Sequence, residues 1–213
     1  GKTMLAKAMA GILPDMQLEG QIELSKIYSV AGLLTRDLPL IVNRPFRVIH
    51  HTASEASIIG GGRDARPGEI SLAHKGVLFL DEFLEFSKSI LETLRQPLED
   101  GEITINRVNQ SCRYPARFSL VGAMNPCPCG YYGDTKKPCV CNPTAIARYQ
   151  RKISGPIVDR VDIWIEVPRL MHETLAPGKR TVGANEQLDT FVAAITSARE
   201  HQRKRFGGRG MTN

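Results

Sequence analysis

Two adjacent acidic residues, Asp81 and Glu82, carry the clearest chemical signal, because they directly follow a short apolar run. Residues 77–80 are all apolar, which is typical of a strand buried on both faces of a parallel sheet. Open α/β sheets bind ligands at the carboxyl ends of their strands, where these two acids would emerge. Asp81 could hold Mg²⁺ through its water shell, and Glu82 could orient or activate the water that attacks a γ-phosphate. A strand ending in a solvated acidic turn is the alternative.

The first three residues match the other half of such a site. Gly1, Lys2 and Thr3 fit the end of the Walker A loop G-x-x-x-x-G-K-[ST]. In that motif the lysine reaches the β- and γ-phosphates, and the hydroxyl binds Mg²⁺. Apolar residues at helical spacing over residues 2–13 predict the helix whose positive end faces the phosphates. Because the chain begins inside the motif, we expect a piece of a longer protein that by itself binds ATP poorly and is inactive.

The apolar spacing around these motifs predicts several helices. Three are expected over residues 20–34, 87–98 and 186–205. Ser87 would cap the second of them, and Pro97 would interrupt it. Residues 36–66 are expected to form a loop that contains one short helix near residues 54–59.

Strand signals complete an α/β pattern with a parallel sheet flanked by helices. Two further strands are expected, over residues 117–124 and 162–167. Residues 103–105 and 112–114 resemble the two arms of a β-hairpin. The carboxyl end of the strand over 117–124 is followed by Asn125, which would then lie beside Asp81 and Glu82.

The order of the longer segments resembles one family. In sequence these segments are a partial GKT, RPFRVIHHTASEASIIGGG, RPGEISLAHKGVLFLDE, LRQPLEDGEITINR, PARFSLVGAMNPCPCGYYGD and SGPIVDRVDIWIEVPRL. They resemble the magnesium-chelatase-like AAA+ ATPases, and within them the YifB/ComM group, over residues 1–170. The resemblance implies an AAA+ P-loop core over 1–170, truncated at the P-loop, and a linker with the start of a helical lid over 171–213. It also implies a homo-hexameric ring with ATP held between subunits.

The resemblance gives Asn125 and Arg160 roles in hydrolysis. Asn125 is similar to sensor 1, an amide that can hydrogen-bond the γ-phosphate or the attacking water; a turn-forming Asn before a proline is the alternative. Arg160 resembles the arginine finger, which is donated across the subunit interface. Its alternative is a local salt bridge to Asp159 or Asp162. Two arginines on the preceding helix, Arg148 and Arg151, could share the interface role.

The same resemblance implies that residues 61–76 form an insertion before the Asp-Glu strand and that residues 103–114 form a hairpin before sensor 1. In related ring motors both features face the central pore. Arg107 and Arg113 are therefore candidate DNA contacts, because arginines neutralise phosphates without reading sequence. A hairpin that carries charge only for solubility is an equal alternative.

Two C-x-C pairs, Cys127 with Cys129 and Cys139 with Cys141, are separated by nine residues. Four thiolates so placed could close a tetrahedral structural site on Zn²⁺, although the spacing is tighter than the usual C-x₂-C. Free thiols and redox pairing remain the alternatives. Cys112, in the expected hairpin, is interpreted as a small packed side chain.

A second metal site at His50 and His51, with or without His74, is not favoured. Adjacent residues in a strand or loop are expected to point to opposite sides, and no carboxylate lies at ligand spacing in the sequence. These histidines are interpreted as polar contacts of the loop that follows Arg47.

Composition limits the class of protein. The chain has 213 residues, 42% hydrophobic and 23% charged, which is enough to bury one substantial core. It has no apolar run of 18 residues, so we expect a cytoplasmic protein with no membrane partner. A net charge of +6 allows an anionic partner such as DNA, although nucleotide binding also needs local positive charge.

Two functions are compared. The favoured one, by resemblance to the YifB/ComM group, is an ATP-driven DNA motor, a helicase promoting branch migration during uptake and recombination of transforming DNA. The alternative is a magnesium-chelatase-type motor subunit that uses ATP to help a partner insert Mg²⁺ into a porphyrin. A scaffold without turnover is disfavoured, because it would have no use for Glu82, Asn125 and Arg160.

Overall fold

The centre of the fold is a three-stranded parallel sheet. A computed structural model describes residues 2–62, 64–107, 110–167 and 184–206. The sheet has the order β1 (Phe46–Ile49), β4 (Val77–Leu80) and β7 (Ser119–Gly122). Register pairs Phe46 with Val77 on one side of β4 and Val77 with Ser119 on the other. The carboxyl ends of the three strands therefore meet at one edge.

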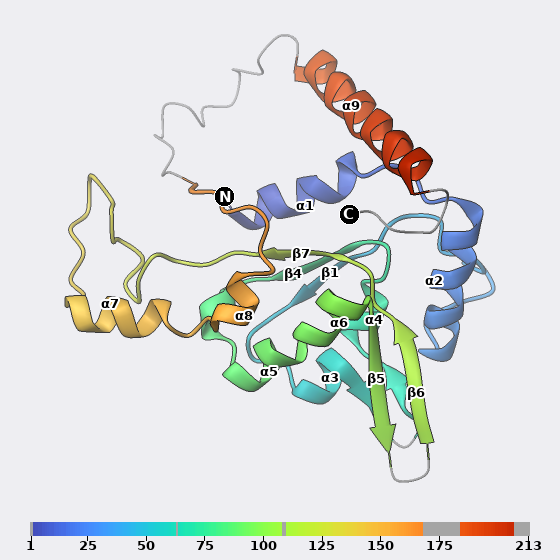
Figure 1. Ribbon diagram of the computed structural model, residues 1–213, viewed down its shortest axis with the longest axis horizontal. Coiled ribbons are helices and arrows are strands. Elements are labelled where there is room, and N and C mark those ends of the chain that lie inside the picture. The colour runs from blue at the N-terminus through green and yellow to red at the C-terminus, as the bar shows by residue number, and fades with distance from the viewer. Residues whose placement is uncertain (1, 63, 108–109, 168–183, 207–213) are drawn as a thin grey trace.

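Helices cover both faces of this sheet, which confirms the predicted α/β class (Figure 1). All four residues of β4 are buried, as the apolar run predicts. Phe79 packs on one face against Ala6 of α1 (Lys2–Ile12) and against Ala123. Leu78 and Leu80 point to the opposite face and join the larger core. Because neighbouring residues of a strand face opposite sides, one short strand anchors both layers.

The helices follow the predicted pattern with shifted ends. Besides α1 they are α2 (Leu18–Val30), α3 (Glu55–Ile59), α4 (Glu69–Leu72), the 3₁₀ turn η1 (Phe83–Glu85), α5 (Lys88–Thr93), α6 (Arg95–Asp100), α7 (Pro143–Gln150), α8 (Gly155–Val158) and α9 (Ala184–Arg205). Ser87 caps α5 as expected, since its Oγ accepts the Ile90 N–H at 3.3 Å. The expected helix over 87–98 breaks at Leu94 instead of Pro97. Pro97 lies in the first turn of α6, where its missing N–H costs little.

Three strand predictions need correction. The expected loop over 36–66 contains β1, whose pattern is hidden because Arg47 lies within it and Val48 is exposed. Residues 162–167 form no strand, and the described residues place no other strand beside them. A strand needs such a neighbour for its hydrogen bonds. The strand predicted over 117–124 is β7, which is shorter and only partly buried because it lies at the edge of the described sheet.

The predicted hairpin is confirmed and is longer than expected. It consists of β5 (Glu102–Arg107) and β6 (Gln110–Pro115), paired antiparallel along their whole length. A smaller pair, β2 (Gly60–Gly61) with β3 (Arg66–Pro67), packs against β5. Gly60 has φ +106°, and a Cβ there would lie 2.3 Å from the Arg66 carbonyl oxygen, so the close approach of β2 to β3 requires glycine.

The C-terminal helix α9 contacts α1 and runs at a slant to it (Figure 1). None of the helices in the described ranges is both long and apolar enough to cross a membrane. The predicted linker and lid start at residue 171, so their first part lies outside the described residues.

Candidate active site

Four of the predicted site residues meet at the carboxyl ends of β4 and β7. Thr3 Oγ1 donates a hydrogen bond to Asp81 Oδ2 at 3.1 Å, across 78 residues of sequence. Lys2 Nζ donates to Asn125 Oδ1 at 3.0 Å and to the Met124 carbonyl at 2.6 Å. Gly1 lies outside the described residues. The first turn of α1 therefore contacts the ends of both strands, with its cation beside the amide and its hydroxyl beside the carboxylate.

This arrangement follows from how the sequence folds locally. α1 is held on the sheet by Ala6, which is 4% exposed and packs on Phe79 directly below it. Residues 2 and 3 then open the helix over the strand ends, where N–H groups and the helix dipole favour anions. Oxygen atoms of a hydroxyl and a carboxylate are the ligands that Mg²⁺ prefers. The cluster could therefore bind a phosphate together with a hard divalent cation.

Glu82 turns away from Asp81 into a different environment. Its backbone is left-handed, with φ 54° and ψ 48°, which is uncommon for a residue other than glycine. Its N–H donates to Asp81 Oδ1 at 3.0 Å, and its half-exposed carboxylate lies 2.9 Å from His51 Nδ1. Asp81 thus faces α1, whereas Glu82 faces the end of β1.

The prediction that the adjacent histidines point apart is wrong. The ring centroids of His50 and His51 are 4.3 Å apart, and with Glu82 they offer three ligand atoms within 4.8 Å of one another. Both residues follow the last residue of β1, so the alternation of a strand no longer applies to them. Since β1 and β4 are parallel neighbours, recognition of β1 in the sequence would have placed His51 beside Glu82.

His74 lies elsewhere and has a structural environment. It is fully buried in the turn between α4 and β4, where its Nδ1 accepts the Arg117 N–H at 3.1 Å. Its Nε2 lies 3.1 Å from Glu23 Oε2 on α2. Burial lowers the pKa of His74, against the opposing effect of Glu23. This histidine connects α2 to the sheet and does not reach the strand ends.

The predicted arginine finger is engaged within its own chain. Arg160, just after α8, forms an ion pair with Glu99 of α6 and donates from Nη1 to the Pro156 carbonyl. The partner of Arg160 is thus neither Asp159 nor Asp162, the two acids expected for a local salt bridge, but a residue distant in sequence. Its role across an interface stays a prediction.

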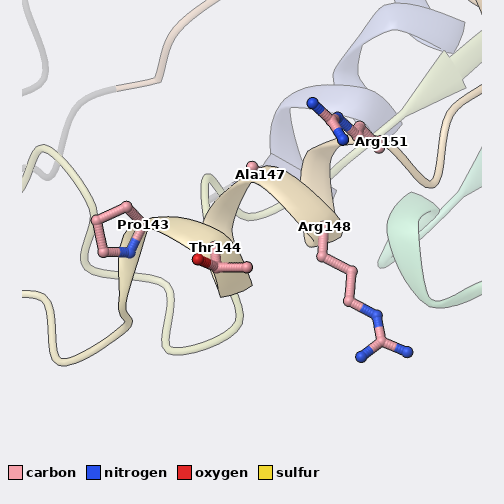
Figure 2. A pocket seen from close by; sticks show the side chains of 5 residues that line it. All are labelled: Pro143, Thr144, Ala147, Arg148 and Arg151. Carbon is pink, nitrogen blue, oxygen red and sulfur yellow. The ribbon is translucent and has the colours of Figure 1, made fainter.

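The two further arginines are Arg148 in α7 and Arg151, which directly follows the helix. Arg148 and Arg151 are exposed and line a shallow groove along the helix with Pro143, Thr144 and Ala147. Figure 2 shows the two guanidinium groups extending from the helix in different directions. Both are therefore accessible to an anionic group on another molecule.

The four cysteines of the C-x-C pairs come together. Cys127 Sγ lies 3.4 Å from Cys129 Sγ and 3.7 Å from Cys139 Sγ, and the latter two sulfurs are 3.6 Å apart. Cys141 completes the group, in which all sulfurs lie within 4.8 Å of one another. None of the five cysteines is in a disulfide. Cys112 lies apart in β6 and is partly buried.

The sulfurs of this cluster differ in acidity. Backbone N–H groups of Tyr131 and then Val140 hydrogen-bond the Cys129 thiolate and lower the pKa of Cys129 to about 6. The Cys141 N–H favours the Cys139 thiolate, but desolvation and the neighbouring sulfurs outweigh it and raise the pKa of Cys139 to about 12. The loop therefore stabilises one thiolate readily, whereas further negative charge needs a counter-ion.

One of the two candidate DNA contacts is described in full. Arg113 on β6 is exposed, and its guanidinium forms an ion pair with Glu102 of β5 at 3.1 Å. Arg107 ends β5, and its side chain lies outside the described residues. The hairpin arm thus offers at least one arginine whose charge is shared with a carboxylate.

We expect Lys2→Ala to weaken ATP binding by the full-length protein about 10- to 100-fold. The reason is the loss of a charge-assisted hydrogen bond worth about 1.5–3 kcal/mol. Lys7→Ala is the matched control, because Lys7 lies on the same helix but is exposed and makes none of the contacts of Lys2. Calorimetric titration with Mg-ATP measures both variants. Equal affinity in wild type and Lys2→Ala would contradict the proposed phosphate contact.

Comparison with known proteins agrees with this geometry. Residues 1–175 match the family model described as magnesium chelatase, subunit ChlI. Competence protein ComM of Haemophilus influenzae is 44% identical over 209 residues, which cover 97% of this chain and 40% of ComM. Protein YifB of Escherichia coli is 42% identical over 209 residues, covering 96% of this chain and 39% of YifB. The magnesium-chelatase 38 kDa subunit of Rhodobacter capsulatus is 31% identical over 141 residues, covering 59% and 40%.

The chain spans about 40% of the length of these curated relatives. The match to the family model nevertheless includes both halves of the site, from Lys2 to Asn125, and the whole parallel sheet. The chain therefore belongs to the YifB/ComM group of the magnesium-chelatase-like AAA+ family.

Proposed function

We propose that the full-length protein is an ATPase whose turnover drives a ring-shaped motor that remodels DNA. The observation that carries the ATPase part is the pair of contacts Thr3–Asp81 and Lys2–Asn125. These contacts bring a phosphate-binding cation, two oxygen ligands for a metal and a neutral amide to the ends of two parallel strands. Such a set is suited to phosphoryl transfer, where positioning and charge stabilisation supply most of the catalysis.

In this proposal each residue has one task. Lys2 contacts the β- and γ-phosphates of ATP, and Thr3 with Asp81 supplies oxygen ligands to Mg²⁺, whose contribution when bound is to neutralise phosphate charge. Glu82 accepts a proton from the water that attacks the γ-phosphorus, as the bond to the ADP oxygen breaks. Asn125 hydrogen-bonds the γ-phosphate or that water. His51 holds the Glu82 carboxylate from the side of β1.

Assembly into a homo-hexamer is a further part of the proposal. Arg160 would stabilise transition-state charge in the neighbouring subunit. In the single chain its guanidinium pairs with Glu99 of α6, so that contact would have to open or be shared when subunits meet. Arg148 of α7 and Arg151 just after it are both exposed and could contribute at the same interface.

DNA is the proposed partner of the motor. The support is the 44% identity to a protein named for competence, together with the net charge of +6. Arg107 and Arg113 on the β5–β6 hairpin are the proposed phosphate contacts. The cofactors in this proposal are ATP and Mg²⁺ at the strand ends and Zn²⁺ at the cysteine cluster. A cytoplasmic location belongs to the same proposal.

A chelatase-type motor is the second candidate function. It is favoured by the match to the family model described as magnesium chelatase and by the 31% identity to a chelatase subunit. That subunit aligns with 59% of this chain, whereas ComM and YifB align with 96% or more. The longer alignment is the reason why DNA remodelling is placed first.

Steady-state ATP hydrolysis by the full-length protein, with and without DNA, tests this proposal. Single-stranded DNA and a four-way junction should each be compared with buffer alone and with heparin, a polyanion that has no bases. We expect DNA to stimulate turnover several-fold and to lose its effect as salt rises, because phosphate contacts release counter-ions. Turnover that ignores DNA would contradict the DNA motor and favour the chelatase-type alternative.

A further inference from the structure

We infer that Cys127, Cys129, Cys139 and Cys141 bind Zn²⁺, and that this metal clamp holds Asn125 in position at the end of β7. The metal site is inferred from the cysteine loop alone. The effect on Asn125 rests on the proposed ATPase function.

The sulfur geometry fits a tetrahedral metal. Zn–S bonds of about 2.3 Å at tetrahedral angles require sulfurs about 3.8 Å apart. Three of the sulfur pairs are 3.4, 3.6 and 3.7 Å apart. A disulfide would need a separation of about 2.05 Å, so these sulfurs are arranged as ligands around a point and not as bonded pairs.

The residues between the two pairs form a turn that suits a metal-thiolate centre. Asp134 Oδ1 accepts the N–H groups of Lys136 and Lys137 at 2.8 and 3.1 Å. Gly130 and Gly133 adopt left-handed φ values of 80° and 82°, which bend the chain back so that the second pair meets the first. The turn therefore brings the second pair back to the first, as four ligands of one ion require.

Charge around the cluster is also complementary. Four thiolates with Zn²⁺ carry two net negative charges, which require nearby donors or cations. The backbone N–H groups of Tyr131 and Val140 hydrogen-bond Cys129. Lys137 lies in the same turn, where its Nζ contacts the Tyr131 hydroxyl at 3.0 Å and lies 4.2 Å from the centre of that ring. The two backbone N–H groups are therefore donors of the kind that the outer shell of a structural zinc site needs, and Lys137 adds a cation to the same turn.

The loop that carries the four cysteines buries few of its residues. Between residues 125 and 144, Cys127 is the only buried residue. A segment with so few apolar contacts cannot offset the entropy of holding one conformation. Metal binding supplies that free energy in small domains with four thiolate ligands, so Zn²⁺ would take the place of a core.

The clamp connects the strand end to α7. Cys127 is two residues from Asn125, and a Cβ on Gly130 would lie 3.9 Å from the Asn125 Cγ. At the other end Asn142 follows Cys141 directly and caps α7 by accepting the Ala145 N–H at 2.7 Å. Gln150, the last residue of α7, donates back to the Pro126 carbonyl at 3.3 Å. Closing the four sulfurs on one ion therefore fixes the backbone that follows Asn125, while the pairing of β7 with β4 holds the strand that precedes it.

Zinc content of the full-length protein, purified without chelator, tests the metal site directly. We expect one Zn²⁺ per chain in the wild type and in Cys112→Ser, whose cysteine lies outside the cluster. Cys139→Ser should lose most of the metal. Titration of wild-type thiols with a mercurial, with a dye that reports released zinc, gives the same answer if Cys139→Ser fails to fold. A wild type without zinc, or zinc retained when the cluster thiols are blocked, would overturn the site.

ATP kinetics then test the effect on Asn125. A displacement of about 1 Å in a positioning group can cost about 100-fold in rate, so zinc-depleted protein should lose about 10- to 100-fold in kcat. Its KM for ATP should change little, because Lys2 and Thr3 are on α1 and not on the loop. Recovery of kcat on adding back zinc is expected. Unchanged kcat after complete zinc loss would overturn the positioning role, whereas a wild type with zinc but no turnover would refute the ATPase and leave the metal site standing.

Discussion

Replacing Glu82 by Gln is expected to lower ATP turnover by the full-length protein about 10²- to 10⁴-fold, the usual contribution of a general base. The amide has the same shape and can keep the contact with His51, but it cannot accept the proton of the attacking water. Lys2, Thr3 and Asp81 are unchanged, so ATP affinity should stay close to that of the wild type. Single-turnover hydrolysis and a binding titration on the same preparation measure the two quantities.

Glu85→Gln is the matched control for this experiment. Glu85 is also a half-exposed carboxylate after β4, but it pairs with Lys152 at 3.2 Å, away from the described side chains of the cluster at the strand ends. It should keep wild-type turnover. Near-normal turnover in Glu82→Gln would show that another group takes the proton, and the His51 side of the site would then be the first place to search.

The parts of the site that could be predicted from sequence are those set by local pattern. A run of four apolar residues ending in Asp81 indicates a buried strand whatever surrounds it. The Lys2–Thr3 pair at the start of a helix is similarly local. Parallel strands align their carboxyl ends, so the meeting of Asn125 with these residues follows once both strands are recognised.

The parts that were missed depend on neighbours far away in sequence. β1 lies at the edge of the described sheet and contains Arg47, and the bidentate partner of that arginine, Glu69, is 22 residues away. Without β1, the approach of His51 to Glu82 could not be foreseen. The same limit applies to Arg160, whose acidic partner is on α6 and not next to it in sequence. Residues 162–167 show the reverse case, in which a local pattern predicts a strand that is not formed. Ile163 and Ile165 occupy alternate positions as in a strand, but the described residues pair no strand with them.

The largest expected effect on stability is that of Phe79→Ala. Phe79 is fully buried in the central strand and stacks on Phe46 with ring centroids 5.9 Å apart. Removing a buried aromatic ring costs about 3–5 kcal/mol, a large share of the 5–15 kcal/mol that stabilises a typical protein. Urea denaturation of the full-length protein should therefore show a much lower midpoint for the transition of this domain.

Val48→Ala is the control that distinguishes the loss of a buried core side chain from the loss of any side chain in the paired strands. Val48 is the register partner of Phe79 on β1, yet 48% of it is exposed, so its truncation should cost less than about 1 kcal/mol. The two variants should differ in Mg-ATP binding as well. Ala6 of α1 packs on Phe79, so the cavity left by the ring lies directly beneath α1, four residues from Lys2. Phe79→Ala should consequently weaken Mg-ATP binding, and Val48→Ala should not. If the two variants lose the same stability or the same affinity, α1 is held over the strand ends by something other than its contact with Phe79.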